Sequence, residues 1–180
     1  VILFSSDSIR IFKDSPSCRR KYFNIQISQI NKIYLANLNN YNLVLRQRNE
    51  FLKIININKE SDMNYLDILN DKYIGLSIVI YNFRRKYVDL VNKYIDGIFS
   101  SITGLEGLKM IYTSNVSNLG NDMFKDKLKS NLSREIQYKI TFIGPNRDDF
   151  YFDLNGKNLS LYGSNGQIRS AVLALKLAEV

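Results

Sequence analysis

Residues 66–94 carry bulky apolar side chains at alternating spacings of three and four, and this pattern constrains the fold more than any other feature of the chain. Such spacings place the side chains on one face of an α-helix, and about four heptads of them predict a long helix with one apolar seam. A seam of this kind needs a packing partner. The seam positions are Leu66, Leu69, Tyr73, Leu76, Ile80, Phe83, Tyr87, Leu90 and Tyr94.

A second helix is predicted directly before the first, over residues 33–55. The polar segment 56–64 predicts the turn between the two helices, so the simplest arrangement is an antiparallel helical hairpin. Its second helix would be about 50 Å long at most, from the rise per residue of an α-helix. We call residues 33–97 the arm. The apolar positions of the earlier helix are Tyr34, Leu38, Tyr41, Leu45, Leu52 and Ile55.

The segments that flank the arm predict β-structure mixed with helices. A strand over 1–4 precedes a helix that begins at Ser15 or Ser17, with Pro16 in its first turn. Asn155-Gly156 is typical of a type I′ hairpin turn. The fold class is therefore α+β, a helical hairpin arm joined to a small β-containing lobe over 105–180, as one continuous unit. The later elements are a strand at 105–113, a helix at 118–134, a strand at 139–143, and hairpin strands at 150–154 and 159–162.

The composition favours an intracellular protein with a polyanionic partner. The net charge is +8, which suits DNA, although the Lys-rich and Asn-rich usage of an AT-rich genome would also raise it. The chain has one cysteine and no histidine, which argues against disulfides and zinc and excludes Ser-His-Asp and Cys-His catalysis. No apolar run approaches the roughly 18 residues of a membrane span, and no signal peptide is evident, so a cytoplasmic location without membrane contact is expected.

Residues 163–169 form a polar turn that opens an apolar helix. Ser164 offers a hydroxyl group, Gly166 has no Cβ, and Gln167 and Arg169 add further donors. The free N–H groups and the positive end of the dipole at such a helix start suit a phosphate group. An ordinary Ser N-cap with a glycine in the turn explains the same residues, so both interpretations stay open.

This turn is similar to the Ser-x-Gly-Gln/Glu signature motif of the ABC-type ATPases, and it most closely resembles that of the RecF recombination and repair proteins. Residues 175–179 (LKLAE) match the end of the family's signature helix, while Asn165 and Ile168 stand where the family has glutamine. Three further blocks match in the same order, at 4–23, 45–53 and 144–149. The departures within them are Ser6, Asp14, Asn24 and Asn146, where the family has Pro, Gly, Asp and His.

The resemblance implies an ATP site shared between two subunits. It implies that the turn contacts the γ-phosphate of an ATP that the opposite subunit holds. It also implies an ATP-dependent homodimer with slow ATP hydrolysis and a role in DNA repair, replication, recombination and the SOS response. The residues that would make the contact are Ser164, Asn165, Gly166, Gln167 and Arg169.

The partners that the resemblance implies are double-stranded DNA, single-strand gap junctions, and the RecO and RecR mediators that load the RecA recombinase. The family places its phosphate loop before this segment and its Mg²⁺-binding acids after it. Neither a Gly-x4-Gly-Lys-Ser/Thr loop nor a strand ending in paired acids occurs here. We therefore expect an internal piece of a longer protein, with no bound cofactor, no metal site and no ATPase activity by itself.

Two basic groups are candidate DNA contacts, one in the first turns of the helix after Pro16 and one on the second arm helix. Cations near a helix N-terminus oppose the dipole unless an anion lies close by, and either a DNA phosphate or a protein carboxylate would serve. A solvated helix face is the plain alternative for the second group. The candidates are Arg19, Arg20, Lys21, Arg84 and Arg85.

The block at 144–149 is a further family motif, for which the residues suggest no catalytic role. Two neighbouring residues of a strand point to opposite faces, so its adjacent carboxylates are no obvious acid–base pair. The matching residues are Gly144, Pro145, Arg147, Asp148 and Asp149.

Two other functions fit part of the evidence. One is another ABC/SMC-type DNA-processing ATPase, such as an overcoming-lysogenization-type nuclease or a condensation protein, although the short arm and the blocks around Arg19 and Gly144 argue against it. The other is a non-enzymatic helical DNA-binding scaffold with a chance Ser-x-Gly turn.

Overall fold

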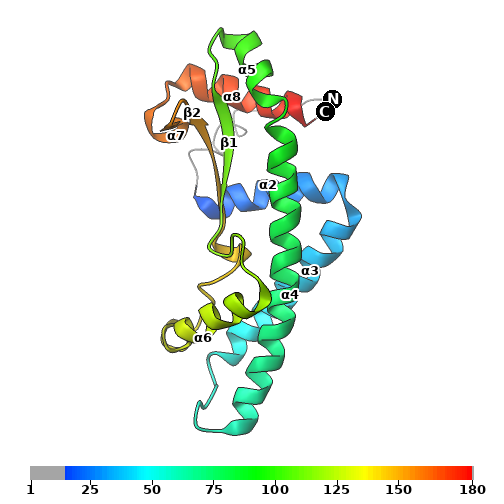
Figure 1. Cartoon of the computed structure of the whole chain (residues 1–180), viewed down its shortest axis with the longest axis vertical. Coiled ribbons are helices and arrows are strands. Elements are labelled where there is room, and N and C mark those ends of the chain that lie inside the picture. The colour runs from blue at the N-terminus through cyan, green and yellow to red at the C-terminus, as the bar shows by residue number, and fades with distance from the viewer. Residues whose placement is uncertain (1–14, 180) are drawn as a thin grey trace. The chain divides into compact units, whose positions relative to one another are not determined.

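The computed structural model describes residues 15–179, so the strand predicted at 1–4 and the first part of the 4–23 block lie outside the described residues. Within them the chain is α+β, as predicted, with helices and one three-stranded antiparallel sheet (Figure 1). No helix of this part is both long enough and apolar enough to span a membrane. The elements are α2 (Pro16–Ile30), α3 (Lys32–Phe51), α4 (Glu60–Val91), α5 (Ile95–Thr103), β1 (Leu108–Thr113), α6 (Asn121–Tyr138), the 3-10 helix η1 (Pro145–Arg147), β2 (Asp149–Leu154), β3 (Lys157–Asn158), α7 (Leu159–Tyr162) and α8 (Asn165–Ala178).

The chain divides into two compact units. The signature unit consists of the residues up to 26, residues 84–113 and the residues from 149 onward, and it contains α5, the sheet, α7 and α8. The arm unit consists of residues 27–83 and 114–148, and it contains α3, α6 and η1. Helices α2 and α4 contribute residues to both units. The predicted arm, 33–97, and the predicted β-containing lobe, 105–180, also contribute residues to both units.

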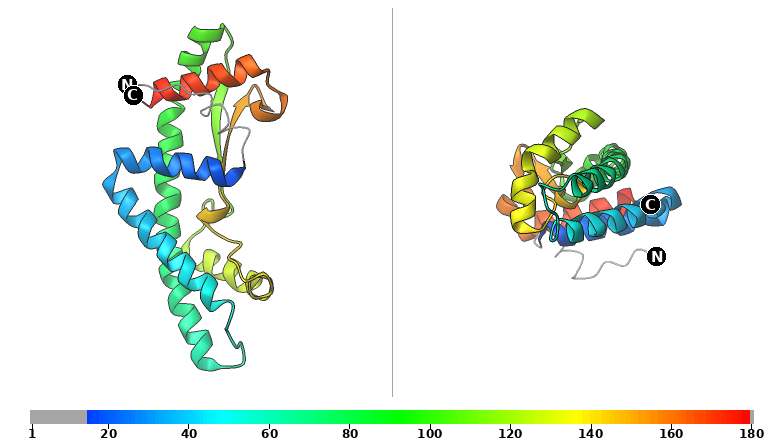
Figure 2. Two further views of the ribbon diagram at one scale, coloured as in Figure 1. Left: turned by 180° about the vertical axis from the view of Figure 1, so that it is seen from behind. Right: turned by 90° about the horizontal axis from the view of Figure 1, so that it is seen from below.

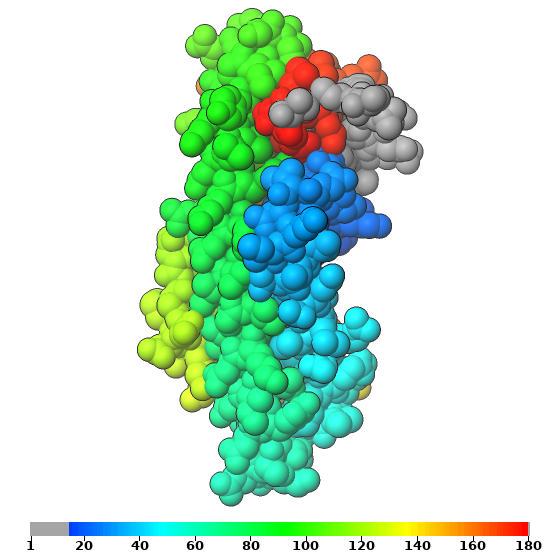
Figure 3. Space-filling view, turned by 90° about the vertical axis from the view of Figure 1, so that its right-hand side faces the viewer, coloured from blue at the N-terminus to red at the C-terminus, as the bar shows by residue number. Residues whose placement is uncertain are grey.

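The antiparallel helical hairpin predicted for the arm is present. The Tyr34 and Phe83 rings lie 5.6 Å apart near one end of the pair. The Phe51 and Tyr65 rings lie 4.8 Å apart near the other end. Helices α3 and α4 therefore run in opposite directions, and Figures 2 and 3 show them side by side. The connection between them spans residues 52–59.

The apolar seam of α4 is buried over most of its length but not at its end. Leu76 and Phe83 are half-buried. Leu90 and Tyr94 are 47% and 56% exposed, so the predicted seam was wrong there. Because α-helices have 3.6 residues per turn, a strict 3.5-residue repeat drifts around a straight helix, and Val91 is buried instead. The buried seam positions are Leu66, Leu69, Tyr73, Ile80 and Tyr87.

The sheet is smaller than predicted. Strands β1 and β2 pair from Leu108 with Leu154 to Thr113 with Asp149, whereas β3 has two residues. The expected turn between β2 and β3 is confirmed, since both of its central residues, 155 and 156, have positive φ angles of 52° and 82°.

The strand predicted at 159–162 was wrong, because this segment is the helical turn α7. The Asn158 side chain accepts a hydrogen bond from the Ser160 N–H at 2.9 Å. Capping of this kind starts a helix rather than extending a strand.

The strand predicted at 139–143 was also wrong. Lys139 ends α6 in the left-handed conformation, with φ 59°. The Thr141 N–H donates to Asn49 Oδ1 at 2.9 Å, and the Phe142 N–H donates to Glu135 Oε1 at 2.7 Å. Side chains of α3 and α6 therefore take the backbone donors that a neighbouring strand would have used.

Candidate functional site

The turn before α8 is a complete capping box. The Ser164 Oγ accepts a hydrogen bond from the Gln167 N–H at 3.1 Å. The Gln167 Oε1 accepts in turn from the Ser164 N–H at 2.9 Å. This reciprocal pair fixes where the helix begins. The N-cap interpretation of the sequence is therefore correct as local structure, and it leaves the Ser164 hydroxyl proton free to be donated outward.

Gly166 lies in the first turn of α8 and is exposed. A Cβ at this position would meet only Ser164 Oγ, at an ordinary 3.8 Å. By contrast, a Cβ on Gly163 would lie 2.5 Å from the Leu159 carbonyl oxygen. The fold thus requires glycine at 163 but not at 166, where alanine would be the better helix former.

The other predicted residues of the turn surround Gly166. Asn165 and Arg169 are exposed, like Ser164, and Gln167 is half-buried because of its role in the cap. The first N–H groups of a helix have no partner within the helix. The turn therefore presents backbone and hydroxyl donors toward the solvent, together with one guanidinium group, as an anion site requires.

The opposite face of α8 anchors the turn. Helix α8 packs against α5 within the signature unit, and the buried residues Ile95 and Phe99 belong to α5. A helix held in this way cannot shift its N-terminus without disturbing a packed core. The buried residues of α8 are Ile168, Ala171, Val172, Ala174 and Leu175.

Glu179, directly after α8, accepts hydrogen bonds from two tyrosines. The Tyr22 hydroxyl donates to its two carboxylate oxygens at 3.1 and 3.0 Å, and the Tyr87 hydroxyl donates to Oε1. The Lys176 Nζ lies 3.5 Å from the same carboxylate. Burial, and then the negative charge of Glu179, raise the pKa of both phenol groups. The sequence showed a family match here but gave no indication of this cluster.

Among the five predicted DNA contacts, Arg19 and Arg84 form hydrogen bonds with side chains of the signature unit. Arg19 forms a bidentate ion pair with Asp149, with Nε–Oδ1 and Nη2–Oδ2 distances of 2.6 and 2.7 Å. Arg84 is 2% exposed and donates to Asn24 Oδ1 at 3.0 Å. The carboxylate partner that the sequence left open is thus present for Arg19.

The other three basic residues differ in exposure. Arg20 is half-buried, whereas Lys21 and Arg85 are exposed. The Arg85 side chain is 58% exposed and lies 3.9 Å from Asp89. Lys21 and Arg85 are therefore the most exposed basic side chains of this set.

The 144–149 motif has structural contacts in the arm unit. Gly144 has a φ of 133°, and a Cβ there would lie 1.9 Å from the Tyr73 hydroxyl oxygen. That hydroxyl donates to the Ile143 carbonyl at 2.8 Å. The Asn146 N–H donates to the Tyr41 hydroxyl oxygen at 2.9 Å. Glycine is thus required at 144, because the backbone there passes close to the Tyr73 hydroxyl group.

The later residues of this motif occupy different environments. The Arg147 guanidinium lies 4.9 Å from the centre of the Phe142 ring. Pro145 and Asp148 are buried, and Asp149 holds Arg19. These contacts support a structural role for the motif.

Arg48, from the 45–53 block, is the centre of a buried polar network in the arm unit. Its guanidinium donates to Glu135 Oε2 at 2.7 Å, Thr141 Oγ1 at 2.7 Å and Asn70 Oδ1 at 2.8 Å. Both partners of the Arg48–Glu135 ion pair are fully buried. Sequence periodicity could not find this network, because Glu135 lies far away in the sequence.

The described residues contain no cluster of three or more His, Cys, Asp or Glu side chains that could hold a metal ion. The exposed Ser-x-Gly-Gln turn at the start of α8 is the feature by which the sequence resembles the signature motif of the ABC-type ATPases.

Comparison with known proteins identifies the family, although no family model matches the chain. The DNA replication and repair protein RecF of Lachnospira eligens is 38% identical over 182 residues, which cover 100% of this chain and 49% of that protein. The RecF protein of Listeria innocua is 36% identical over 187 residues, covering 100% of this chain and 50% of its own length. The chain belongs to the RecF family and spans about half the length of these relatives.

Solved structures agree with this assignment. The structure of the recombination mediator protein RecF with ATPrS, described as part of the RecFOR pathway, matches with a TM-score of 0.89 and 32% identity. The match covers 99% of this chain and 49% of that one. The corresponding ATP complex gives a TM-score of 0.88 and 33% identity, with the same coverage.

Proposed function

We propose that this chain is the signature-bearing part of a cytoplasmic RecF-type ATPase that dimerises on ATP and Mg²⁺ and binds DNA at single-strand gaps. There it would act with the RecO and RecR mediators to promote loading of the RecA recombinase. The family relationship supports this proposal, as do the ATP and ATPrS complexes of the structural relatives.

The role proposed for the turn is to bind the γ-phosphate of an ATP held by a second subunit. Ser164 would donate its hydroxyl proton, because its oxygen already accepts from the Gln167 N–H. The Gly166 N–H and the helix dipole would add to the field at the phosphate. Arg169 is exposed on the same first turns and would supply positive charge.

This arrangement would couple ATP to dimerisation. The contact between turn and phosphate forms only when two subunits close on one nucleotide, so ATP stabilises the dimer by the free energy of that contact. The chain has no histidine, and we assign it no catalytic base. Its contribution to hydrolysis would be electrostatic stabilisation of the transferring phosphate, a type of contact for which one lost donor costs about 2.7–4 kcal/mol.

For DNA we propose Lys21 and Arg85 as phosphate contacts, because both side chains are exposed. Arg19 and Arg84 would instead fix the helices that carry them, through Asp149 and Asn24.

The observation that carries the proposal is the glycine at 166, which the fold does not need. The test is sedimentation of the full-length protein with and without ATP, comparing the parental protein with Ser164→Arg. Because the turn is a capping box, this substitution should cost about 0.5–2 kcal/mol of helix stability and should abolish the ATP-dependent dimer.

Ser130→Arg, on the exposed surface of α6, is the matched control and should dimerise normally. If Ser164→Arg still forms the ATP-dependent dimer, the turn is only a helix cap.

A further inference from the structure

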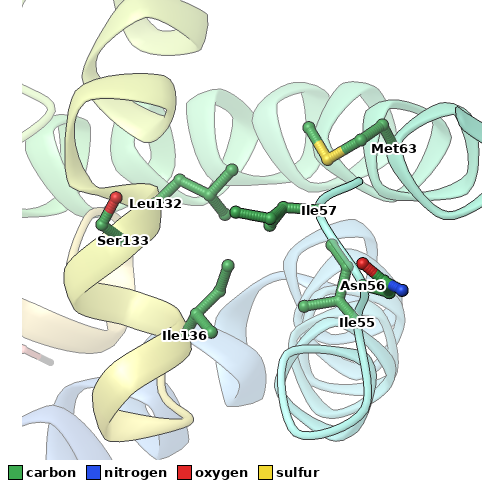
Figure 4. Close-up of a pocket in the computed structure, with 7 residues that line it drawn as sticks. All are labelled: Ile55, Asn56, Ile57, Met63, Leu132, Ser133 and Ile136. Carbon is green, nitrogen blue, oxygen red and sulfur yellow. The ribbon is translucent and has the colours of Figure 1, made fainter. Parts of the chain in front are cut away.

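Helix α6 presents two different faces in its C-terminal half. Leu132, Ser133 and Ile136 line an open hollow beside the connection after α3 (Figure 4). Arg134 and Tyr138 follow Leu132 and Ile136 by two residues each, and that spacing turns a helical side chain by about 200°. Arg134 and Tyr138 therefore lie on the face of α6 that points away from the hollow, and the function proposed above does not use this second face.

Two arginines of this face share one aromatic ring. The guanidinium carbon of Arg134 lies 4.4 Å from the centre of the Phe142 ring, and that of Arg147 lies 4.9 Å from it. The Tyr138 ring stands edge-on to the same ring, with 5.7 Å between the centres. The Arg147 Nε also donates to the Thr141 carbonyl at 3.3 Å, which orders this side chain. We call Arg134, Tyr138, Phe142 and Arg147 the arginine–aromatic cluster, and all four belong to the arm unit.

The positive charge of the cluster is not balanced by its own segment. Residues 127–147 contain five basic residues and one acid, Glu135, which is buried and paired with Arg48. Arg134 and Arg147 are both exposed, and neither forms an ion pair within residues 15–179. Two guanidinium groups on one ring repel each other, and an anion bound between them would remove that repulsion.

The neighbouring elements do not supply the missing negative charge. Glu50 of α3 is paired with Lys53 at 2.7 Å. The segment 114–121, which binds the backbone beside the cluster through its Asn115 side chain, contains no acid. Asp126 lies about 12 Å along α6 before the cluster, from the rise per residue. Asp148 directly follows the cluster but is fully buried, so its carboxylate is not at the surface.

Lys127 extends the basic face along the helix. It lies seven residues before Arg134, which places both side chains on one face of α6. Its Nζ donates to the Asn115 carbonyl at 3.0 Å, and the Asn115 amide donates to the Phe142 carbonyl at 2.9 Å. From Lys127 to Tyr138 the face is about 16 Å long. A row of positive charge of this length suits a strand with several phosphates better than a single small anion.

We propose that this face of α6 binds single-stranded nucleic acid. The guanidinium groups of Arg134 and Arg147 contact phosphates, and Tyr138, which is 57% exposed, stacks on an unpaired base. Aromatic side chains within a positively charged groove are the usual design of single-strand binding surfaces. A duplex offers the phosphates but keeps its bases stacked inside, so it leaves Tyr138 unused. The proposal extends the binding at single-strand gaps proposed above, and it does not depend on the Ser164 turn or on ATP.

The experiment measures fluorescence anisotropy of labelled oligo(dT), and of a labelled duplex of the same length, with the full-length protein at several salt concentrations. Arg134→Glu should weaken oligo(dT) binding by about tenfold or more, the loss typical of a charged contact. It should also flatten the salt dependence by about 0.7 units of slope for each lost phosphate contact. Tyr138→Ala should weaken oligo(dT) binding by about fivefold or more, because it removes one stacked base. The duplex affinity of Tyr138→Ala should equal that of the parental protein.

Two controls match these changes. Lys129→Glu reverses an exposed charge on the same helix, but Lys129 lies three and four residues before Leu132 and Ser133 and so shares the face that lines the hollow. Tyr94→Ala removes a ring that is 56% exposed, close to the value for Tyr138. Both control proteins should bind oligo(dT) with parental affinity.

Several results would overturn the proposal. They are a parental protein that does not bind oligo(dT), control changes that weaken binding as much as the test changes, and a Tyr138→Ala protein with parental affinity for oligo(dT). An equal loss of duplex and oligo(dT) affinity in Tyr138→Ala would assign the face to duplex DNA instead. Sedimentation with ATP should show a parental dimer for both test proteins, so this result is separate from that for the Ser164 turn. Unchanged melting temperatures verify folding, and Tyr138→Ala decides the matter if Arg134→Glu melts lower.

Discussion

Gly166→Ala distinguishes the helix-capping role of the turn before α8 from its proposed phosphate-binding role, because the folded chain does not need this glycine. The added methyl group would meet only Ser164 Oγ, at 3.8 Å. Replacing glycine by alanine at a helical position with free space stabilises a protein by about 0.4–1 kcal/mol. For a chain of this size, that corresponds to a rise of about 1–4 °C in melting temperature. The same methyl group would stand where we propose that the phosphate of the partner subunit approaches the backbone.

We therefore expect Gly166→Ala to be as stable as the parental protein or more so, and to lose ATP-dependent dimerisation. The assay is sedimentation of the full-length protein with and without ATP, together with thermal melting. Gly75→Ala is the matched control, since Gly75 is an exposed helical glycine of α4 with nothing within 4 Å of an added Cβ. It should gain stability and dimerise normally. An ATP-dependent dimer of Gly166→Ala with parental affinity would refute the reasoning.

Five further substitutions test other parts of the structure. Arg48→Met leaves the buried Glu135 carboxylate without its cation and should cost about 3–5 kcal/mol in urea unfolding; a loss below about 1 kcal/mol would contradict the network. Ile80→Asp puts a charge at a fully buried seam position and should unfold the arm. Unchanged helicity in circular dichroism would disprove this. Lys21→Glu and Arg85→Glu should each weaken DNA binding for all sequences alike and flatten its salt dependence by about one unit of slope; unchanged slopes would mean that both residues are merely solvated. The pKa of Tyr87 is raised above its ordinary 10.0, so its contribution to the free energy of unfolding is full below pH 10 and falls above it, by up to about 1.4 kcal/mol per pH unit. In urea unfolding, Tyr87→Phe should therefore lose less stability than the parental protein as the pH rises above 10. An equal loss in both proteins would contradict this role of Tyr87.

The sequence predicted those parts of the fold that local pattern controls. The three-four spacing of residues 66–94 predicted the long helix of the arm, because the periodicity of a helix shows in its own residues. The same is true of the turn at Asn155-Gly156, where glycine and asparagine tolerate the positive φ angles of 82° and 52°. The Ser164 turn could also be predicted, since an N-cap residue is recognised by its own side chain, which accepts a hydrogen bond from a backbone N–H close by in the sequence.

The predictions that were wrong concern segments whose structure depends on side chains far away in the sequence. Residues 139–143 have the apolar character of a strand, but Asn49 and Glu135 bind two of their N–H groups. The sequence contains many acids and amides, and nothing in it marks these two as the partners of residues 139–143. The Arg48 network was hidden for the same reason. A guanidinium group that is fully buried looks no different in a sequence from one that is solvated, and only the packing around it decides which it is.

The cap and the proposed phosphate site are compatible explanations of the same turn. The mutual hydrogen bonds of Ser164 and Gln167 fix the start of α8 without any ligand. The buried side chain of Ile168 anchors the same end of the helix in the core. A site whose donors are already ordered loses less conformational entropy on binding. Ser164→Arg would remove the cap and obstruct the phosphate together, so a lost dimer in that variant has two possible causes. Gly166→Ala leaves the cap intact, and for that reason its result tells the two roles apart.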